Sequence, residues 1–327
     1  MSVLAGLLDP LEVKGLTLKN RIVMPPMQTS VATTEGAVTD KLIEHYTRRS
    51  KALGMLIIEH SYVSLDGRLS ERQLGIYDDG LVPGLEKLSS SVHATGTPVV
   101  IQINHAGRTA STETTGTKPV APSPSENARE LRTEEIEALT EAFAKAAERA
   151  MKAGFDGVEV HGAHGFLLNQ FFSPLANRRR DMYGGSLENR MNFPLQVVER
   201  VKERVGGRLL FYRLGSDDLD PEGTKIKDSK KFAVKLEEAG VDIIDVSGGL
   251  CGSRPTQLED RQGYFISQAQ QIKKEVNVPV IGVGGITEPE YANSLIQRGR
   301  VDLVAVGRAL LKDPDWAINA IKTLKRS

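Results

Sequence analysis

Two histidines stand three residues apart in the run His-Gly-Ala-His-Gly-Phe, directly after an apolar segment. Side chains alternate between the faces of a strand, so His161 shares a face with Glu159, and His164 follows the strand end. Two imidazoles flanked by glycines could bind a metal, transfer protons or hydrogen-bond an oxygen atom. A third metal ligand is not apparent in the sequence, and a neutral oxygen-binding pair needs none. We therefore expect catalytic histidines and no metal site.

Glycines and an arginine follow the last two apolar segments of the chain. Gly284 and Gly285 come after the first of these segments, and Gly307 and Arg308 after the second. Glycine lets backbone N–H groups approach a phosphate closely, a helix N-terminus adds a favourable dipole, and arginine adds a two-pronged positive charge. These two neighbouring loops predict a phosphate-binding site.

A dinucleotide fingerprint is the rival interpretation of the same glycines. Gly282 and Gly284 have its spacing, and Asp302 lies about twenty residues further on. The third glycine position is Thr287, however, and Asp302 precedes its apolar segment instead of ending it. The sequence therefore favours a mononucleotide phosphate over a Rossmann site.

Polar side chains also lie within or at the ends of other apolar segments. Gln102 and Arg213 lie within such segments, where a buried polar group needs a partner. A flat heterocycle with N–H and C=O edges would supply one, and a polar layer inside a barrel is the alternative. Further candidates close the first and second segments: Pro26, Met27, Gln28 and His60.

Eight short apolar segments alternate with segments of helical periodicity, which predicts a parallel sheet. Eight such units favour closure, so we expect an α/β fold, a single (β/α)₈ TIM barrel over residues 1–327 with its site at the C-terminal strand ends. The expected strands are Arg21–Met24, Leu56–Glu59, Val99–Ile103, Gly157–His161, Leu209–Leu214, Asp242–Val246, Val278–Val283 and Val301–Val306. The expected helices are Lys41–Leu53, Leu81–Thr95, Thr133–Ala153, Asn192–Val205, Asp228–Ala239, Ile266–Val276, Glu288–Gln297, Arg308–Leu311 and Asp315–Leu324.

Helix ends carry their own signals. Thr133 and Asp228 are expected N-caps, and Gly154, Gly240 and Gly299 each end a helix in the left-handed conformation that suits glycine. The stretch from 109 to 127 is rich in Ser, Thr, Pro and Gly and is expected to be a long loop beside the site.

Composition limits the partners. Lys+Arg and Asp+Glu balance at 42 each, which argues against nucleic acid as a partner. The one cysteine excludes a disulfide framework and a four-thiolate metal site in these 327 residues. With no signal-peptide pattern and no long apolar run, we expect a cytoplasmic protein without membrane contact that acts on a small molecule. The sequence leaves a homo-oligomer open.

Taken together, these residues resemble the Old Yellow Enzyme family of flavin-dependent ene-reductases. The likeness runs from about Pro10 to Leu324, and is greatest to single-domain thermophilic-type members and to the barrel half of 2,4-dienoyl-CoA reductases. The matching runs are 18–24 with Pro26 and Met27, 102–108, 161–164, 173–178, 183–190 and 306–308.

The resemblance implies a non-covalent FMN and NAD(P)H as the electron donor. Gln102 would contact the pyrimidine edge of the flavin and Arg213 the N1/C2 side. The residues implied in cofactor binding are Pro26, Met27, Gln28, His60, Gln102, Arg213, Gly284, Gly285, Gly307 and Arg308.

The resemblance also implies the reaction. His161 and His164 would hydrogen-bond the carbonyl or nitro oxygen of the substrate, in a pocket that includes Gln28, His60 and Phe166. The expected activity is NAD(P)H-dependent reduction of activated C=C bonds in enones, enals or related compounds.

Two departures from the family pattern keep other functions open. Phe166 stands where the family usually carries a proton-donating tyrosine, which motivates a flavin barrel with altered chemistry, a dehydrogenase or isomerase. The lack of a cysteine set for an iron–sulfur cluster motivates an electron-carrying flavin subunit of a larger complex.

Overall fold

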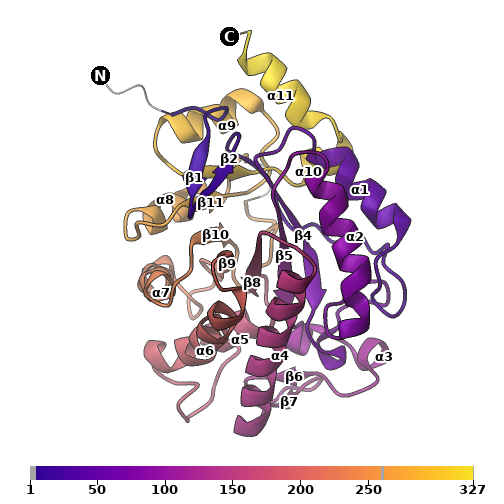
Figure 1. Cartoon of the computed structure of the whole chain (residues 1–327). Helices are drawn as coiled ribbons and strands as arrows, with labels where there is room; N and C mark the ends of the chain where they lie inside the picture. The colour runs from indigo at the N-terminus through magenta and orange to yellow at the C-terminus, as the bar shows by residue number, and fades with distance from the viewer. Residues whose placement is uncertain (1–4, 259–260, 327) are drawn as a thin grey trace.

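Eight parallel strands close into a barrel in the computed structural model, which describes residues 5–258 and 261–326 (Figure 1). The order around the barrel is β10-β11-β12-β3-β4-β5-β8-β9. The ring closes where β12 pairs with β3, with Val304 opposite Ile22 and Ala305 opposite Val23. The barrel strands are β3 (Ile22–Met24), β4 (Met55–Tyr62), β5 (Val99–Asn104), β8 (Gly157–Gly162), β9 (Leu209–Gly215), β10 (Ile243–Ser247), β11 (Val280–Gly282) and β12 (Leu303–Ala305). All eight expected strands and the (β/α)₈ fold are confirmed.

The helices surround the strands (Figure 1). In α4, Ile136, Phe143, Ala147 and Ala150 recur at helical spacing and are buried, because one face of an outer helix must cover the barrel. The main helices are α1 (Asp40–Ser50), α2 (Val82–His93), α4 (Thr133–Lys152), α6 (Leu187–Val205), α7 (Ile226–Glu238), α8 (Ile266–Lys273), α9 (Pro289–Gln297), α10 (Arg308–Lys312) and α11 (Trp316–Leu324). Within the described residues, none of the helices is long and apolar enough to cross a membrane.

The predicted N-caps are wrong, whereas the predicted helix-ending glycines are confirmed. Thr133 is the first residue of α4, and Asp228 is the third residue of α7. Each helix is instead capped by the carboxylate at its third position, and Asp228 accepts from the Lys225 N–H at 3.3 Å. The helix-ending glycines have positive φ angles: Gly154 79°, Gly240 94° and Gly299 62°.

A hairpin covers one end of the barrel. Its strands are β1 (Leu11–Val13) and β2 (Leu16–Leu18). Val13 and Leu18 pack in one apolar cluster with Met55 and Leu209, which begin β4 and β9. The hairpin therefore closes the amino end of the strands and leaves the carboxyl end for ligands.

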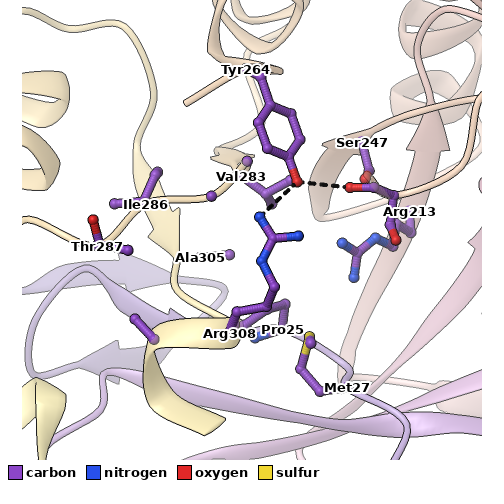
Figure 2. Close-up of a pocket in the computed structure, with 15 residues that line it drawn as sticks. Pro25, Met27, Arg213, Ser247, Tyr264, Val283, Ile286, Thr287, Ala305 and Arg308 are labelled. Carbon is purple, nitrogen blue, oxygen red and sulfur yellow. Dashed lines mark hydrogen bonds between the residues drawn. The ribbon is translucent and has the colours of Figure 1, made fainter. Parts of the chain in front are cut away.

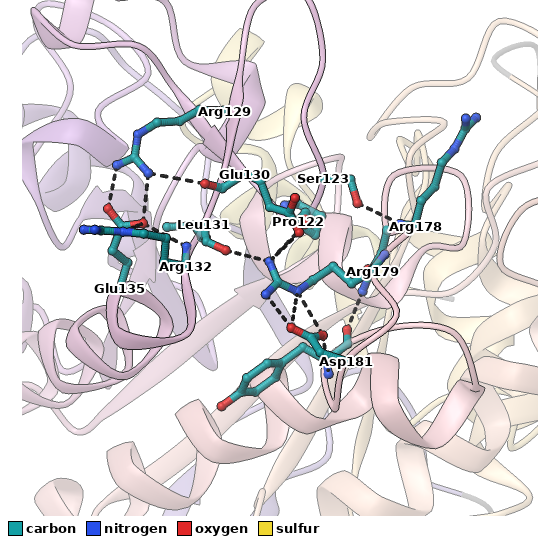
Figure 3. Close-up of polar contacts among 12 residues, drawn as sticks. Pro122, Ser123, Arg129, Glu130, Leu131, Arg132, Glu135, Arg178, Arg179 and Asp181 are labelled. Carbon is teal, nitrogen blue, oxygen red and sulfur yellow. Dashed lines mark hydrogen bonds and ion pairs between the residues drawn. The ribbon is translucent and has the colours of Figure 1, made fainter.

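Short elements and a polar cluster organise the loops at the carboxyl end. The expected loop from 109 to 127 contains α3 (Thr112–Thr115) and β6 (Val120–Ala121), which pairs with β7 (Arg129–Glu130). Arg179 donates to the Pro122 and Leu131 carbonyls and pairs with Asp181 (Figure 3). This arginine ties the loop after β8 to the loop after β5. The remaining elements are α5 (Leu167–Phe172), η1 (Leu65–Gly67), η2 (Asp79–Leu81) and η3 (Gly107–Thr109).

Candidate active site

A pocket lies where the loops after β3, β11 and β12 meet (Figure 2). Gly284 and Gly285 have φ angles of 126° and 63°, and a Cβ on Gly284 would lie 2.7 Å from the Tyr264 nitrogen. A Cβ on Gly307 would lie 2.8 Å from the Met27 sulfur. The positive φ angles of Gly284 and Gly285 favour glycine, and without side chains these loops bring backbone amide groups to the pocket wall.

Arg308 contributes a positive charge to this pocket, which Arg213 also lines. It is the first residue of α10, and its side chain points into the pocket toward Tyr264 (Figure 2). Its Nη2 donates to the Tyr264 hydroxyl at 3.3 Å, and that hydroxyl donates to the Ser253 carbonyl at 2.9 Å. Amides, a guanidinium and a hydroxyl together form a donor set that fits a phosphate group.

The sequence did not point to Tyr264. It precedes α8 and lies twenty residues before the glycine pair, without a motif that links the two. Pro25 and Met27 line the same pocket, whereas Pro26 and Gln28 do not. Gln28 is exposed and donates to the Ser70 hydroxyl at 2.8 Å.

A buried polar layer fills the barrel beside this pocket. Gln102 donates to Glu159 at 2.7 Å, and Arg213 Nη1 lies 3.4 Å from Asp245. The Gln102 Oε1 and Arg213 Nε atoms are buried without a hydrogen-bond partner among the described residues. A polar layer is therefore present, as the alternative expected. Its unpartnered atoms include the Gln102 Oε1 acceptor and the Arg213 Nε donor, which a heterocycle edge fits.

Burial favours the protonated form of both carboxyl groups of this layer. Burial raises the pKa of Glu159 well above its ordinary value, and the neighbouring Asp245 raises it further. Burial also raises the pKa of Asp245, against the attraction of Arg213. Burial therefore opposes a negative charge on both carboxyl groups, and the Arg213 charge offsets part of this effect.

The histidine pair lies at the carboxyl end of β8, as expected. The rings of His161 and His164 are 5.1 Å apart at 85°. His161 Nδ1 accepts from the Ala163 N–H at 3.3 Å, and His164 Nε2 lies 2.7 Å from the Ser247 hydroxyl. Burial lowers the pKa of both rings well below the usual range, so both are neutral at pH 7.

His164 adopts an uncommon backbone conformation. Its φ of 59° is left-handed, which is costly for a residue with a Cβ. Strain of this kind persists where the surroundings hold it and is frequent at functional sites. Here the His164 N–H donates to the Gly248 carbonyl, so the β8 and β10 ends are joined at this residue.

His60 and Phe166 complete the ring cluster. The Phe166 ring lies 4.8 Å from the His161 ring and 5.3 Å from the His60 ring. The structure thus brings four expected residues together: His60, His161, His164 and Phe166. Gln102 and Arg213 lie on the two strands that flank β8.

Comparison with known proteins assigns nearly the whole chain to one family. The NADH:flavin oxidoreductase / NADH oxidase family matches residues 6–326. The chain is 44% identical over 317 residues to an NADH oxidase of Thermoanaerobacter brockii, covering 93% of this chain and 49% of that protein. It therefore spans about half the length of that relative.

Other relatives match from end to end. An NADPH dehydrogenase of a Geobacillus species is 41% identical over 323 residues, covering 97% of this chain and 94% of that protein. The solved structure of an old yellow enzyme homologue from Zymomonas mobilis superposes with a TM-score of 0.86 at 27% identity, covering 98% of this chain and 93% of that one. The resemblance to the Old Yellow Enzyme family is thereby confirmed.

Proposed function

Because the chain belongs to the NADH:flavin oxidoreductase / NADH oxidase family, whose cofactor is FMN, we propose that it reduces activated C=C bonds with electrons from NAD(P)H. The substrates are enones, enals or related small molecules. The observation that carries the proposal is that a phosphate cradle, a polar layer with unpaired atoms and a neutral histidine pair share one barrel mouth.

The residues present fit FMN, and we propose residues 1–327 as one FMN-binding barrel. Arg308 and the amides around Gly284, Gly285 and Gly307 would hold the phosphate. The unpaired Gln102 and Arg213 atoms would face the polar edge of the ring. Further contacts would come from residues at the ends of β3 and β4: Pro26, Met27, Gln28 and His60.

When bound, FMN supplies the hydride, and the protein orients the substrate. His161 Nδ1 accepts a backbone N–H, so its proton lies on Nε2 and is free for donation. The Ser247 hydroxyl would donate to His164 Nε2, so the proton of the neutral His164 ring would lie on Nδ1. Two neutral donors on a carbonyl or nitro oxygen withdraw electrons from the conjugated double bond and make its β-carbon electrophilic.

Stopped-flow spectroscopy of the purified protein tests the proposal. We expect about one FMN per chain, bleaching by NADH or NADPH without oxygen, and recovery of the oxidised spectrum on mixing with cyclohexenone. Colourless protein that FMN cannot reconstitute would overturn the cofactor assignment. Bleaching without recovery by any enone or enal would instead favour a dehydrogenase, an isomerase or an electron-carrying subunit.

A further inference from the structure

His60 is held in one orientation by Gln73, a fully buried residue of the loop after β4. Gln73 Nε2 lies 2.8 Å from His60 Nδ1 and 2.9 Å from the His60 carbonyl. Gln73 Oε1 accepts from the Leu69 N–H at 2.7 Å, which fixes the amide orientation. Both N–H groups of Gln73 therefore face His60, so its Nδ1 is an acceptor and its proton lies on Nε2.

This N–H belongs to the ring cluster at the barrel mouth. The His60 ring lies 6.2 Å from His161 and 5.3 Å from Phe166, and the residue is 7% exposed. Phe166 has no exchangeable proton, and the proposed function uses His161 and His164 to bind the substrate oxygen. His60 is the remaining imidazole of the cluster.

Reduction of a polarised C=C bond has a requirement that the oxygen-binding pair does not meet. The incoming hydride brings two electrons and forms the C–H bond at the β-carbon. The former π electrons then reside on the α-carbon and the bound oxygen, and the α-carbon needs a proton. A positioned donor typically accelerates such a step about a hundred- to ten-thousand-fold.

We propose that His60 is a further catalytic residue, which donates its Nε2 proton to the α-carbon of the substrate. This assignment rests on the proposed C=C reduction. The Nε2–H bond breaks as the α C–H bond forms, and solvent water returns a proton to Nε2. NAD(P)H is oxidised, and the alkene gains one hydride and one proton.

The surroundings of His60 suit a neutral acid. Burial and the charge of Arg213 lower the pKa of His60 to about 4, so the ring is uncharged at pH 7. The charged group that lowers the pKa of His60 is Arg213 from β9, and His60 in turn lowers the pKa of His161 and His164 at the end of β8. The Gln73 N–H at Nδ1 and the Arg213 charge both stabilise a ring that has lost its Nε2 proton.

Gln73 is then a positioning residue. A substitution of similar size can test this role separately from the role of Gln73 in packing. Gln73→Glu would accept a proton from Nδ1 and raise the pKa of His60. The acid in that variant is the imidazolium, which is lost as pH rises through the raised pKa. Enone reduction by wild-type protein should be independent of pH between about 6 and 8, whereas Gln73→Glu should slow as pH rises.

The direct test compares two oxidants of the pre-reduced holoenzyme in stopped flow. His60→Ala and His60→Gln should slow reoxidation by cyclohexenone about 100-fold or more. Reoxidation by nitrocyclohexene should change less than about threefold, because its nitronate is a stabilised anion that water protonates after release. Retained FMN and unchanged reduction by NAD(P)H report on folding. His45→Gln is the matched control, since this ring on α1 also has a pKa of about 4.

The tautomer gives a readout that does not depend on turnover. Long-range proton–nitrogen spectra of histidine-labelled protein should show His60 as the Nε2–H form, and Gln73→Glu should move the proton to Nδ1. An Nδ1–H form in wild type, or equal enone rates in wild type and both His60 variants, would overturn the assignment. Wild-type protein that reoxidises with nitrocyclohexene but with no enone would contradict the proposed substrate class, and with it the assignment.

Discussion

The histidines at the barrel mouth differ from solvent-exposed histidines mainly in their charge. Burial keeps His60, His161 and His164 neutral, so they offer N–H donors without full positive charges. The permanent cation beside them is Arg213, which already lies near Asp245. A site of this kind binds an oxygen through directed hydrogen bonds, and it discriminates by geometry more than by charge.

The histidine pair should strengthen phenol binding. A phenol such as p-hydroxybenzaldehyde, hydrogen-bonded through its oxygen, should stack on oxidised FMN and produce a long-wavelength charge-transfer band. The double variant His161→Ala/His164→Ala loses two donors, so we expect at least about tenfold weaker binding with FMN retained. An absorbance titration measures this, with His45→Gln as control. An undiminished band in the double variant would show that the pair is structural.

Glu59 should make stability depend on pH in an unusual direction. Burial raises its pKa to about 7, although two hydrogen bonds from Thr29 favour the charged form. A carboxyl with a raised folded-state pKa stabilises most below its unfolded pKa, and this contribution is lost as pH rises through the folded value. Relative to Glu59→Gln, wild-type protein should lose about 3 kcal/mol of unfolding free energy from about pH 4 to 8. Urea unfolding of both proteins across this range checks it, and parallel pH profiles would contradict it.

Secondary-structure elements were predictable where the burial of their residues produces a regular pattern of apolar residues in the sequence. Parallel strands are buried on both faces and appear as short apolar runs, so all eight were found. Helix α5 was missed because all six of its residues are buried, which removes the polar face. The β1–β2 hairpin was missed because its strands have only three residues each.

Residues of the site were predictable only where they lie on a strand or directly after one. His161, Gln102, Arg213 and Arg308 lie on strands or directly after them, and their type stands out against an apolar run. Gln73 lies in a loop 13 residues after His60, and Tyr264 lies in a loop 44 residues before Arg308, with no motif that links either pair. Their importance comes from contacts that only the folded chain creates.

The helix-ending glycines give a prediction about backbone strain alone. Gly299 has a φ of 62° and open space around its Cβ position, so Gly299→Ala meets strain without a steric clash. We expect it to reduce the unfolding free energy by about 1 kcal/mol. Gly207 also has open space but no left-handed φ, so Gly207→Ala is the control. Equal unfolding midpoints for the two variants would argue against a left-handed cap.

At the scale of the whole molecule, the phosphate pocket lies across the closure of the barrel. Met27 follows the first barrel strand, whereas Gly284 and Arg308 follow the last two. Occupancy should therefore stabilise the folded chain, by about 2.7 kcal/mol when FMN is a hundredfold above its Kd. Thermal unfolding of apoprotein with increasing FMN measures this.

Arg308→Ala tests whether Arg308 contributes to the stabilisation of the folded chain by FMN. Loss of a charge-assisted contact should weaken FMN binding roughly 10- to 100-fold, so the same FMN concentration should raise the Tm less. Arg298→Ala removes an exposed arginine at the end of α9 and should behave as wild type. Identical FMN-induced shifts in the Arg308→Ala and Arg298→Ala proteins would exclude Arg308 as a phosphate anchor.

The pairing of β12 with β3 also sets an order of events during synthesis. A chain leaves the ribosome amino end first, and β3 emerges about 280 residues before its partner, roughly 15 to 60 s at ordinary elongation rates. Throughout that interval one edge of β3 has no neighbour, and for most of it the glycines and arginine of the phosphate cradle have not yet been translated. FMN therefore cannot guide the growing chain through its cradle. The nascent protein must protect this edge by other means until translation is nearly complete, and the cofactor is captured only afterwards.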